Sequence, residues 1–325
     1  MIVDIENSEF EILSRLAYQI TICPSENPDS FCKQVKELSE HIPNRIKEFF
    51  RDFIIKGSLN GFLLFRGNLF YDDLFVPTPQ NNTFNVGEKT NIAKIQAILI
   101  SLLGDMISYE AEGYGRLFQD VVPVQSMANN QTSIGSNTEL EIHTEQAFSK
   151  LRPDFLSLAC LRGDSQALTY ILPVQSILDN LSDDEIELLK KPLWYTGVDL
   201  SFKLNGNEFI EGDIRGPMPI LSVDAGSEKM GLVFDQDLMR GTDDVSCKLI
   251  EKIVDIYYRC RISHNLKPGE IIFIDNRMAV HGRSPFFPNY DGWDRFLVRC
   301  FATLQYGTSE YARPDGGRTV AAIYS

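Results

Sequence analysis

Residues 269–283 read Gly-Glu-Ile-Ile-Phe-Ile-Asp-Asn-Arg-Met-Ala-Val-His-Gly-Arg, and this stretch is the first indication of a β-rich fold. The leading glycine predicts a turn, the apolar run behind it predicts a buried strand, and the Asn-Arg pair predicts a second turn. His281 follows that turn, and Gly282 allows the backbone to crowd a site. Taken alone, such a histidine is more often a packed or capping residue than a ligand.

A second histidine stands in the sequence Glu-Ile-His-Thr-Glu at residues 141–145. Residues 139–148 alternate in a strand-like way, and residues two apart on a strand project from the same face. Both His143 and Glu145 could therefore reach one metal, but for this pair alone a charged, solvated strand edge is the simpler explanation. Together with His281 they would supply two imidazoles and one carboxylate, the ligand set of non-haem Fe(II) oxygenases.

The pattern of apolar residues divides the chain into a helical part, about 1–110, and a strand-rich part, about 111–310. Short β-branched and aromatic runs between Gly, Asn, Asp and Pro are typical of an antiparallel sandwich or barrel. No linker or internal repeat is visible, so we expect one domain over residues 1–325. Helices are expected at 7–21, 30–56, 90–107, 182–190 and 243–260, and strands at 61–67, 155–160, 167–172, 193–202, 220–223, 231–234, 270–275 and 295–305.

Composition limits the classes of partner. The formal net charge of −14 argues against nucleic acid or an anionic membrane, because both require a basic face. No secretory signal and no run of about 18 apolar residues is visible, so we expect a cytoplasmic protein that does not span a membrane. Six scattered cysteines without a CxxC pair predict reduced, mostly buried thiols.

Two further charged pairs are candidates for ligand binding. Arg295 and Arg299 lie four apart on an apolar run, so both should point to one face of a buried strand. A buried guanidinium needs an anion, so the pair would bind two carboxylates or form structural ion pairs. Asp235 and Asp237 would clamp an ammonium or guanidinium, or else cap the helix expected from residue 243.

In this order, the motifs resemble the clavaminate-synthase-like branch of the Fe(II)/2-oxoglutarate-dependent oxygenases over residues 60–310. The resemblance rests on the runs 115–123, 136–145, 234–239 and 276–285, and on an arginine 14 residues past His281. It implies an α+β, mainly β fold with a double-stranded β-helix (jelly-roll) core flanked by helices. Within the branch, the chain looks most similar to bacterial free L-lysine 3- and 4-hydroxylases.

The resemblance also implies a role for each candidate residue. His143, Glu145 and His281 would bind iron(II), and O2 would be a further reactant. Arg295, with Thr169 as a helper, would bind the distal carboxylate of the cosubstrate 2-oxoglutarate. Arg299 would bind the α-carboxylate of the substrate, and Glu145 and Glu112 would bind its α-ammonium. Asp235 and Asp237 would bind the cationic end of the substrate side chain. Residues 203–228 fall where the family has a mobile lid.

The resemblance therefore predicts an amino-acid hydroxylase. Its substrate would be a free basic amino acid, L-lysine at C3 or C4, and its products would include succinate and CO2. An L-arginine or L-asparagine hydroxylase of the same branch is one alternative, and a non-catalytic ligand-binding barrel is another. A homo-oligomer is compatible with the sequence, because many oligomers are symmetric assemblies of one chain.

Overall fold

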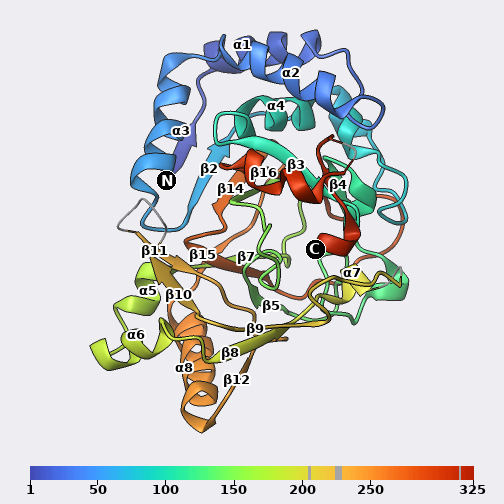
Figure 1. The fold of residues 1–325 in the computed structure, drawn as a ribbon. Coiled ribbons are helices and arrows are strands. Elements are labelled where there is room, and N and C mark those ends of the chain that lie inside the picture. Colours follow the sequence, from blue (N-terminus) through green and yellow to red (C-terminus); the bar gives the residue numbers. More distant parts are fainter. Residues whose placement is uncertain (204–205, 224–228, 315) are drawn as a thin grey trace.

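The computed structural model describes residues 1–203, 206–223, 229–314 and 316–325. Two sheets lie at the centre of the molecule, and helices cover the outer face of each (Figure 1). Most of the long helices precede residue 101, and most of the strands follow it.

The larger sheet has eight strands in the order β1-β2-β14-β6-β16-β3-β17, with β4 also paired to β16. The long central strands β14, β6 and β16 run antiparallel to one another. The strands are β1 (Ile2–Asp4), β2 (Phe62–Arg66), β3 (Asp105–Tyr109), β4 (Gln119–Val121), β6 (Phe155–Arg162), β14 (Glu270–Asp275), β16 (Phe296–Thr303) and β17 (Thr319–Val320).

The smaller sheet has four antiparallel strands in the order β13-β7-β15-β5. They are β5 (Leu140–His143), β7 (Thr169–Pro173), β13 (Ile262–His264) and β15 (Ala279–Arg283). The remaining strands form two further sheets, with β8 (Trp194–Gly197), β9 (Ile214–Met218) and β12 (Arg240–Gly241) in one, and β10 (Leu221–Val223) and β11 (Met230–Leu232) in the other.

Strand alternation separates the two sides of the larger sheet. On β14, Ile271 and Phe273 pack toward the N-terminal helices, whereas Ile272 and Ile274 join an apolar cluster on the other side. Ile171, from β7 of the smaller sheet, belongs to this second cluster. The two sheets therefore face each other across a shared core, where polar residues on their inner faces can meet.

Most of the α-helices form two groups at opposite ends of the molecule (Figure 1). α1 (Asn7–Gln19), α2 (Pro28–Ser39), α3 (Asn44–Lys56) and α4 (Asn91–Ile100) cover the larger sheet, and α5 (Val174–Leu178), α6 (Asp183–Leu189) and α8 (Asp244–Cys260) cover the smaller one. Pro43 is the N-cap of α3 and divides the predicted helix 30–56 in two. No helix in the described part of the chain combines the length and the apolar character that a membrane crossing requires.

Two further predicted elements differ from the structure in this part of the chain and around residue 200. The helix predicted over 90–107 ends at Ile100, because the chain enters β3 beside β16; a Cβ on Gly104 would lie 2.4 Å from the carbonyl oxygen of Thr303. The strand predicted over 193–202 ends at Gly197 and is followed by the short helix α7 (Leu200–Lys203). Phe202 on α7 is fully buried, so the apolar pattern that predicts a strand here belongs in part to a helical turn.

Asp73 should stabilise the start of α4. Its buried carboxylate accepts the backbone N–H groups of Asn91 (3.0 Å) and Ile92 (2.8 Å), which have no partner inside the helix. We expect Asp73→Ala to lower the free energy of unfolding by about 1–3 kcal/mol in urea titration. Asp72→Ala is the matched control because Asp72 is exposed; equal losses in the two variants would contradict this role.

Candidate active site

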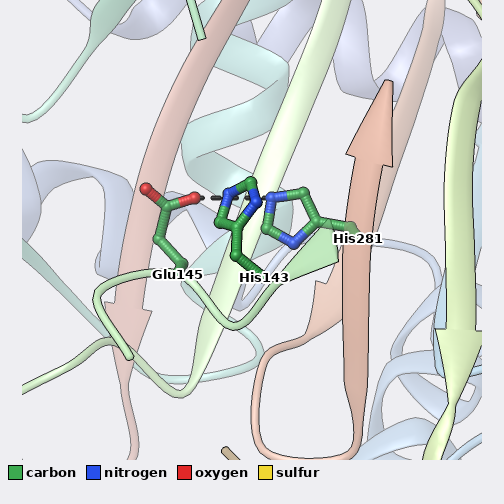
Figure 2. A group of neighbouring side chains, drawn as sticks. All are labelled: His143, Glu145 and His281. Carbon is green, nitrogen blue, oxygen red and sulfur yellow. Dashed lines mark ion pairs between the residues drawn. The ribbon is translucent and has the colours of Figure 1, made fainter. Parts of the chain in front are cut away.

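The antiparallel pairing of β5 with β15 places His143 directly opposite His281. Their ring centroids lie 4.4 Å apart, and His281 Nε2 is 3.5 Å from Oε2 of Glu145. Figure 2 shows His143 and Glu145 from one segment meeting His281 from another. One ring nitrogen of each histidine and one Glu145 oxygen lie within 4.8 Å of one another, the one such group of candidate metal ligands among the described residues.

Glu145 is placed beside the two histidines by a turn after β5, and not by alternation along the strand. β5 ends at His143, so the strand predicted over residues 139–148 is wrong beyond that point. His143 also forms an isolated antiparallel bridge with Asp235, and Gln146 then takes a left-handed φ of 54°. The carboxylate therefore meets the two imidazoles from a turn after the strand.

Asn276 fixes the backbone of Glu145. Its Oδ1 accepts the Glu145 N–H at 2.7 Å, and its Nδ2 donates to the carbonyl groups of Glu145 (3.1 Å) and Pro153 (2.8 Å). Asn276 is fully buried and lies between β14 and β15, a few residues before His281. It ties the carboxylate to the turn that leads to the second histidine, a role that the sequence alone did not indicate.

The protonation states of the group suit a divalent metal, which binds carboxylates and neutral imidazoles. Burial alone would raise the pKa of Glu145, but Arg299 and the two histidines lower it to about 2. Burial and His143 lower the pKa of His281 to about 4. Nδ1 of His143 lies 2.8 Å from the Glu141 carbonyl oxygen, which leaves Nε2 for a metal. His281 Nδ1 is buried and lacks a hydrogen-bond partner in the described chain, so these residues fit a 2-His-1-carboxylate iron site.

Gly282 is required by the pairing of the two metal-ligand strands. A Cβ at this position would lie 2.6 Å from the carbonyl oxygen of Leu140 on β5 and 3.2 Å from the Tyr257 hydroxyl. Any side chain would therefore push β15 away from β5 and separate His281 from its partner strand. The glycine allows a close approach, as predicted, but the approach is to the neighbouring strand.

Arg299 connects the larger sheet to the metal-ligand group. It lies on β16 between Leu297 and Phe301, which alternation turns toward the smaller sheet. The buried guanidinium forms ion pairs with Glu112 and with Oε1 of Glu145 (3.0 Å), and its Nε donates to Gln119 Oε1 at 3.0 Å. The structure thus brings Arg299, Glu112 and Glu145 together, as the substrate roles expected for them require.

The pocket beside this group is strongly acidic. Arg299 is the one lysine or arginine among the described residues that line it, against six carboxylates. The space between its lining residues, including open solvent at the mouth, is about 540 Å³. The six carboxylates belong to Glu112, Glu141, Glu145, Asp199, Asp235 and Asp237.

The structure places Asp235 and Asp237 on one wall of the pocket. Asp235 is buried beside His143, and its Oδ1 accepts the Leu238 N–H at 2.7 Å, whereas Asp237 is exposed at the rim. Asp243 is the N-cap of α8, so the capping alternative for the aspartate pair does not hold.

Two lining carboxylates had no role in the sequence prediction. Glu141 lies two residues before His143 on β5, so alternation along that strand could have found it. Asp199 carried no such signal, because it precedes α7 in a region predicted as strand. Residues 199–201 line the pocket, whereas Lys203 and the described residues 206–223 do not. The rest of the predicted lid at 203–228, namely 204–205 and 224–228, lies outside the described residues.

Arg295 is a buried cation without an acidic partner. It is 5% exposed and lies just before β16, on the same side as Arg299, as the spacing predicts. Burial lowers its pKa to about 10, and no ion pair to it occurs among the described residues. Its guanidinium lies 5.6 Å from the Phe286 ring, and Arg283 lies 5.0 Å from the same ring. Thr169 on β7 pairs with Arg283, so it lies in the same region.

Comparison with known proteins gives matches over most of the chain. Residues 60–301 match the family described as taurine catabolism dioxygenase TauD, TfdA family. L-lysine 3-hydroxylase of Catenulispora acidiphila is 44% identical over 324 residues, which cover 100% of this chain and 90% of that protein. Clavaminate synthase 2 of Streptomyces clavuligerus is 29% identical over 304 residues, with 92% and 91% covered. The crystal structure of an asparagine oxygenase with Fe(II), 2S,3S-3-hydroxyasparagine and succinate superposes with a TM-score of 0.88 at 29% identity, over 98% of this chain and 99% of that one.

If His143, Glu145 and His281 bind a divalent ion, that ion should stabilise the folded protein. Because a ligand of the folded state stabilises it by mass action, Mn²⁺ at about 100 times its Kd should add about 2.7 kcal/mol and raise Tm by several degrees. His143→Ala and His281→Ala should each lose this shift in thermal melts, whereas His41→Ala, at an exposed position, should keep it. A full Mn²⁺ shift in His281→Ala would exclude that residue as a ligand.

The contacts of Asn276 predict an effect on metal binding. Asn276→Ala removes both hydrogen bonds to the Glu145 backbone, and we expect about 10–100-fold weaker binding of Mn²⁺ in calorimetry, as for residues that orient metal ligands elsewhere. Asn276→Asp keeps the acceptor and loses the donor, so it should be intermediate. Asn60→Ala, at an exposed position, is the control. Unchanged affinity in a folded Asn276→Ala protein would refute the positioning role.

Proposed function

We propose that this chain, which belongs to the TauD/TfdA family of dioxygenases, hydroxylates free L-lysine at C3. Its family makes it an Fe(II)/2-oxoglutarate-dependent dioxygenase, and the predicted resemblance to clavaminate-synthase-like oxygenases is confirmed. The substrate assignment rests on the charges of the pocket, in which six acidic residues stand against one described lysine or arginine, Arg299. The relative that is 44% identical, an L-lysine 3-hydroxylase, supports both the substrate and the carbon.

His143, Glu145 and His281 would hold the iron. When bound, iron(II) with 2-oxoglutarate and O2 supplies the oxidation of an unactivated C–H bond, with release of succinate and CO2. The protein residues decide which carbon is presented. The register of β5 and β15 holds the two imidazoles, and Asn276 holds the Glu145 backbone, so the ligands are in place before any substrate arrives.

Arg299 and its two acidic partners suit the α-carbon end of an amino acid. A zwitterion presents a carboxylate and an ammonium on one carbon, and the buried Arg299 stands between Glu112 and Glu145. The substrate carboxylate would take the guanidinium, and its α-ammonium would take the carboxylates that Arg299 now neutralises. In this exchange the substrate carboxylate replaces a protein carboxylate on Arg299, and the α-ammonium replaces Arg299 on that carboxylate. No buried charge is then left without a partner.

Asp235 and Asp237 would then receive the cationic end of the side chain. A neutral side chain such as that of asparagine would leave these carboxylates without a counter-charge, so the acidic wall favours a basic substrate. Arginine satisfies the same charge pattern and is the remaining alternative within the family.

Arg295 would bind the distal carboxylate of 2-oxoglutarate. The guanidinium is buried, and within the described chain it has no ion pair. A bound carboxylate would therefore neutralise its charge. Thr169 would add a hydroxyl donor from β7. We further interpret the two facing sheets as a jelly-roll core in one domain. The cytoplasmic location and a homo-oligomeric state stay predictions, and the proposal depends on neither.

The substrate can be tested directly with a panel of amino acids. The purified protein, Fe(II), 2-oxoglutarate and O2 would be incubated with L-lysine, L-ornithine, L-arginine or L-asparagine, while succinate is measured. We expect L-lysine to stimulate succinate formation most strongly, and a product 16 mass units heavier whose NMR spectrum places the hydroxyl on C3. Arg299→Lys should lose at least 100-fold in kcat/KM, because an ammonium cannot replace the bidentate fork. Stimulation by asparagine instead of lysine would overturn the substrate.

A further inference from the structure

We propose that Asp199 is a third carboxylate for the terminal ammonium of the substrate, and that it makes the pocket select a primary ammonium over a guanidinium. The inference rests on the proposed function, in which Arg299 holds the α-carboxylate of a free basic amino acid. It adds a specificity-determining residue from a segment that is separate in the sequence from Asp235 and Asp237.

Asp199 shares the pocket with the two aspartates that are proposed to receive the cationic end of the substrate. It follows β8 and directly precedes α7, and it lines the same pocket as Asp235 and Asp237. Within the described chain, its carboxylate has no hydrogen bond or ion pair. Leu200 and Ser201 line the pocket beside it, so the start of α7 forms a wall of the site.

The electrostatic surroundings of Asp199 favour a cation next to it. Burial raises the pKa of Asp199 well above its usual range, and Asp235 is the neighbour that raises it most. Glu112, Glu145 and Asp237 raise the pKa of Asp199 further, so four pocket carboxylates act on it. An ammonium bound among them would remove this repulsion, and no described lysine or arginine besides Arg299 lines the pocket to do so.

A buried hydroxyl also indicates a polar ligand in this pocket. Thr132 lines it and is 7% exposed, and its Oγ1 has no hydrogen-bond partner in the described chain. An unpaired buried hydroxyl is unfavourable, and a ligand that carries donors would satisfy it. The acidic wall is therefore accompanied by an unpartnered acceptor on a different segment.

The geometry of the donors distinguishes lysine from arginine. An ammonium carries three N–H donors that point in three directions, whereas a guanidinium is a flat fork that prefers two oxygens side by side. Carboxylates on two separate segments, with Asp199 on one and Asp235 and Asp237 on the other, can accept from different directions around one nitrogen. This arrangement fits a primary ammonium.

The segment that carries Asp199 is anchored to the loop behind the metal ligands. Phe202 is fully buried, and its ring packs edge-on against Phe148 at 4.9 Å between centroids. Asn207 Nδ2 donates to the Phe202 carbonyl at 3.0 Å. Phe148 lies three residues after Glu145, so Asp199 is held by packing against the same loop that presents the carboxylate ligand.

The test compares L-lysine with L-norleucine, which has the same carbon chain and no terminal nitrogen. Under nitrogen, each amino acid would be titrated by calorimetry into the enzyme loaded with Fe(II) and 2-oxoglutarate. We expect Asp199→Asn to weaken L-lysine at least tenfold and to leave L-norleucine unchanged. In turnover assays, its preference for L-lysine over L-arginine should fall by a similar factor. Asp213→Asn, an exposed residue paired with Lys203 at 3.7 Å, is the control and should bind both amino acids as the wild type does.

The outcomes separate this inference from the proposed function. If the wild type binds L-lysine and Asp199→Asn binds it equally well, Asp199 has no part in recognition. Equal weakening of L-lysine and L-norleucine would mean that Asp199 only shapes the pocket, and this would also overturn the inference. Failure of the wild type to bind L-lysine would overturn the proposed function, and the inference with it.

Discussion

The register between β5 and β15 is the constraint on which the site depends. It sets His143 opposite His281, and the close approach permitted by Gly282 keeps the two strands paired. Side chains alternate along a strand, so a slip of one residue would turn His281 outward to the side where Val280 packs with the helices. The apolar residues around the histidines are therefore as important for the metal-ligand group as the ligands, because they specify which face of each strand is buried.

Much of the fold could be predicted because apolar periodicity is a local signal. The strands β2, β6, β14 and β16 and the helix α8 lie close to their predicted ranges. Errors arose where tertiary contacts override the local pattern, as at Gly104, where the approach to β16 ends a helical run. The residue types of the site could be read from spacing and resemblance. The position of Glu145 could not, since it depends on a turn whose backbone is held by the distant Asn276.

Asp199 illustrates the same limit. No motif marks it, and its role depends on the packing of a short helix that resembles a strand in sequence. The charge pattern of the pocket is only partly visible in the sequence for a related reason. Glu112, Glu145, Asp235 and Asp237 have predicted roles, whereas Glu141 and Asp199 join them only in the folded chain. An overall charge of −14 gives no indication of where the negative charge is concentrated.

The contact between Phe148 and Phe202 bears on whether metal binding and amino-acid binding affect each other. Phe148 lies three residues after the ligand Glu145, and Phe202 belongs to the helical turn beside Asp199, so the two walls of the site are in direct contact. Thermodynamic linkage makes such an effect reciprocal: the factor by which the amino acid tightens the metal equals the factor by which the metal tightens the amino acid. The Phe148–Phe202 contact is the place where such linkage between the metal-ligand turn and the pocket wall at Asp199 would act.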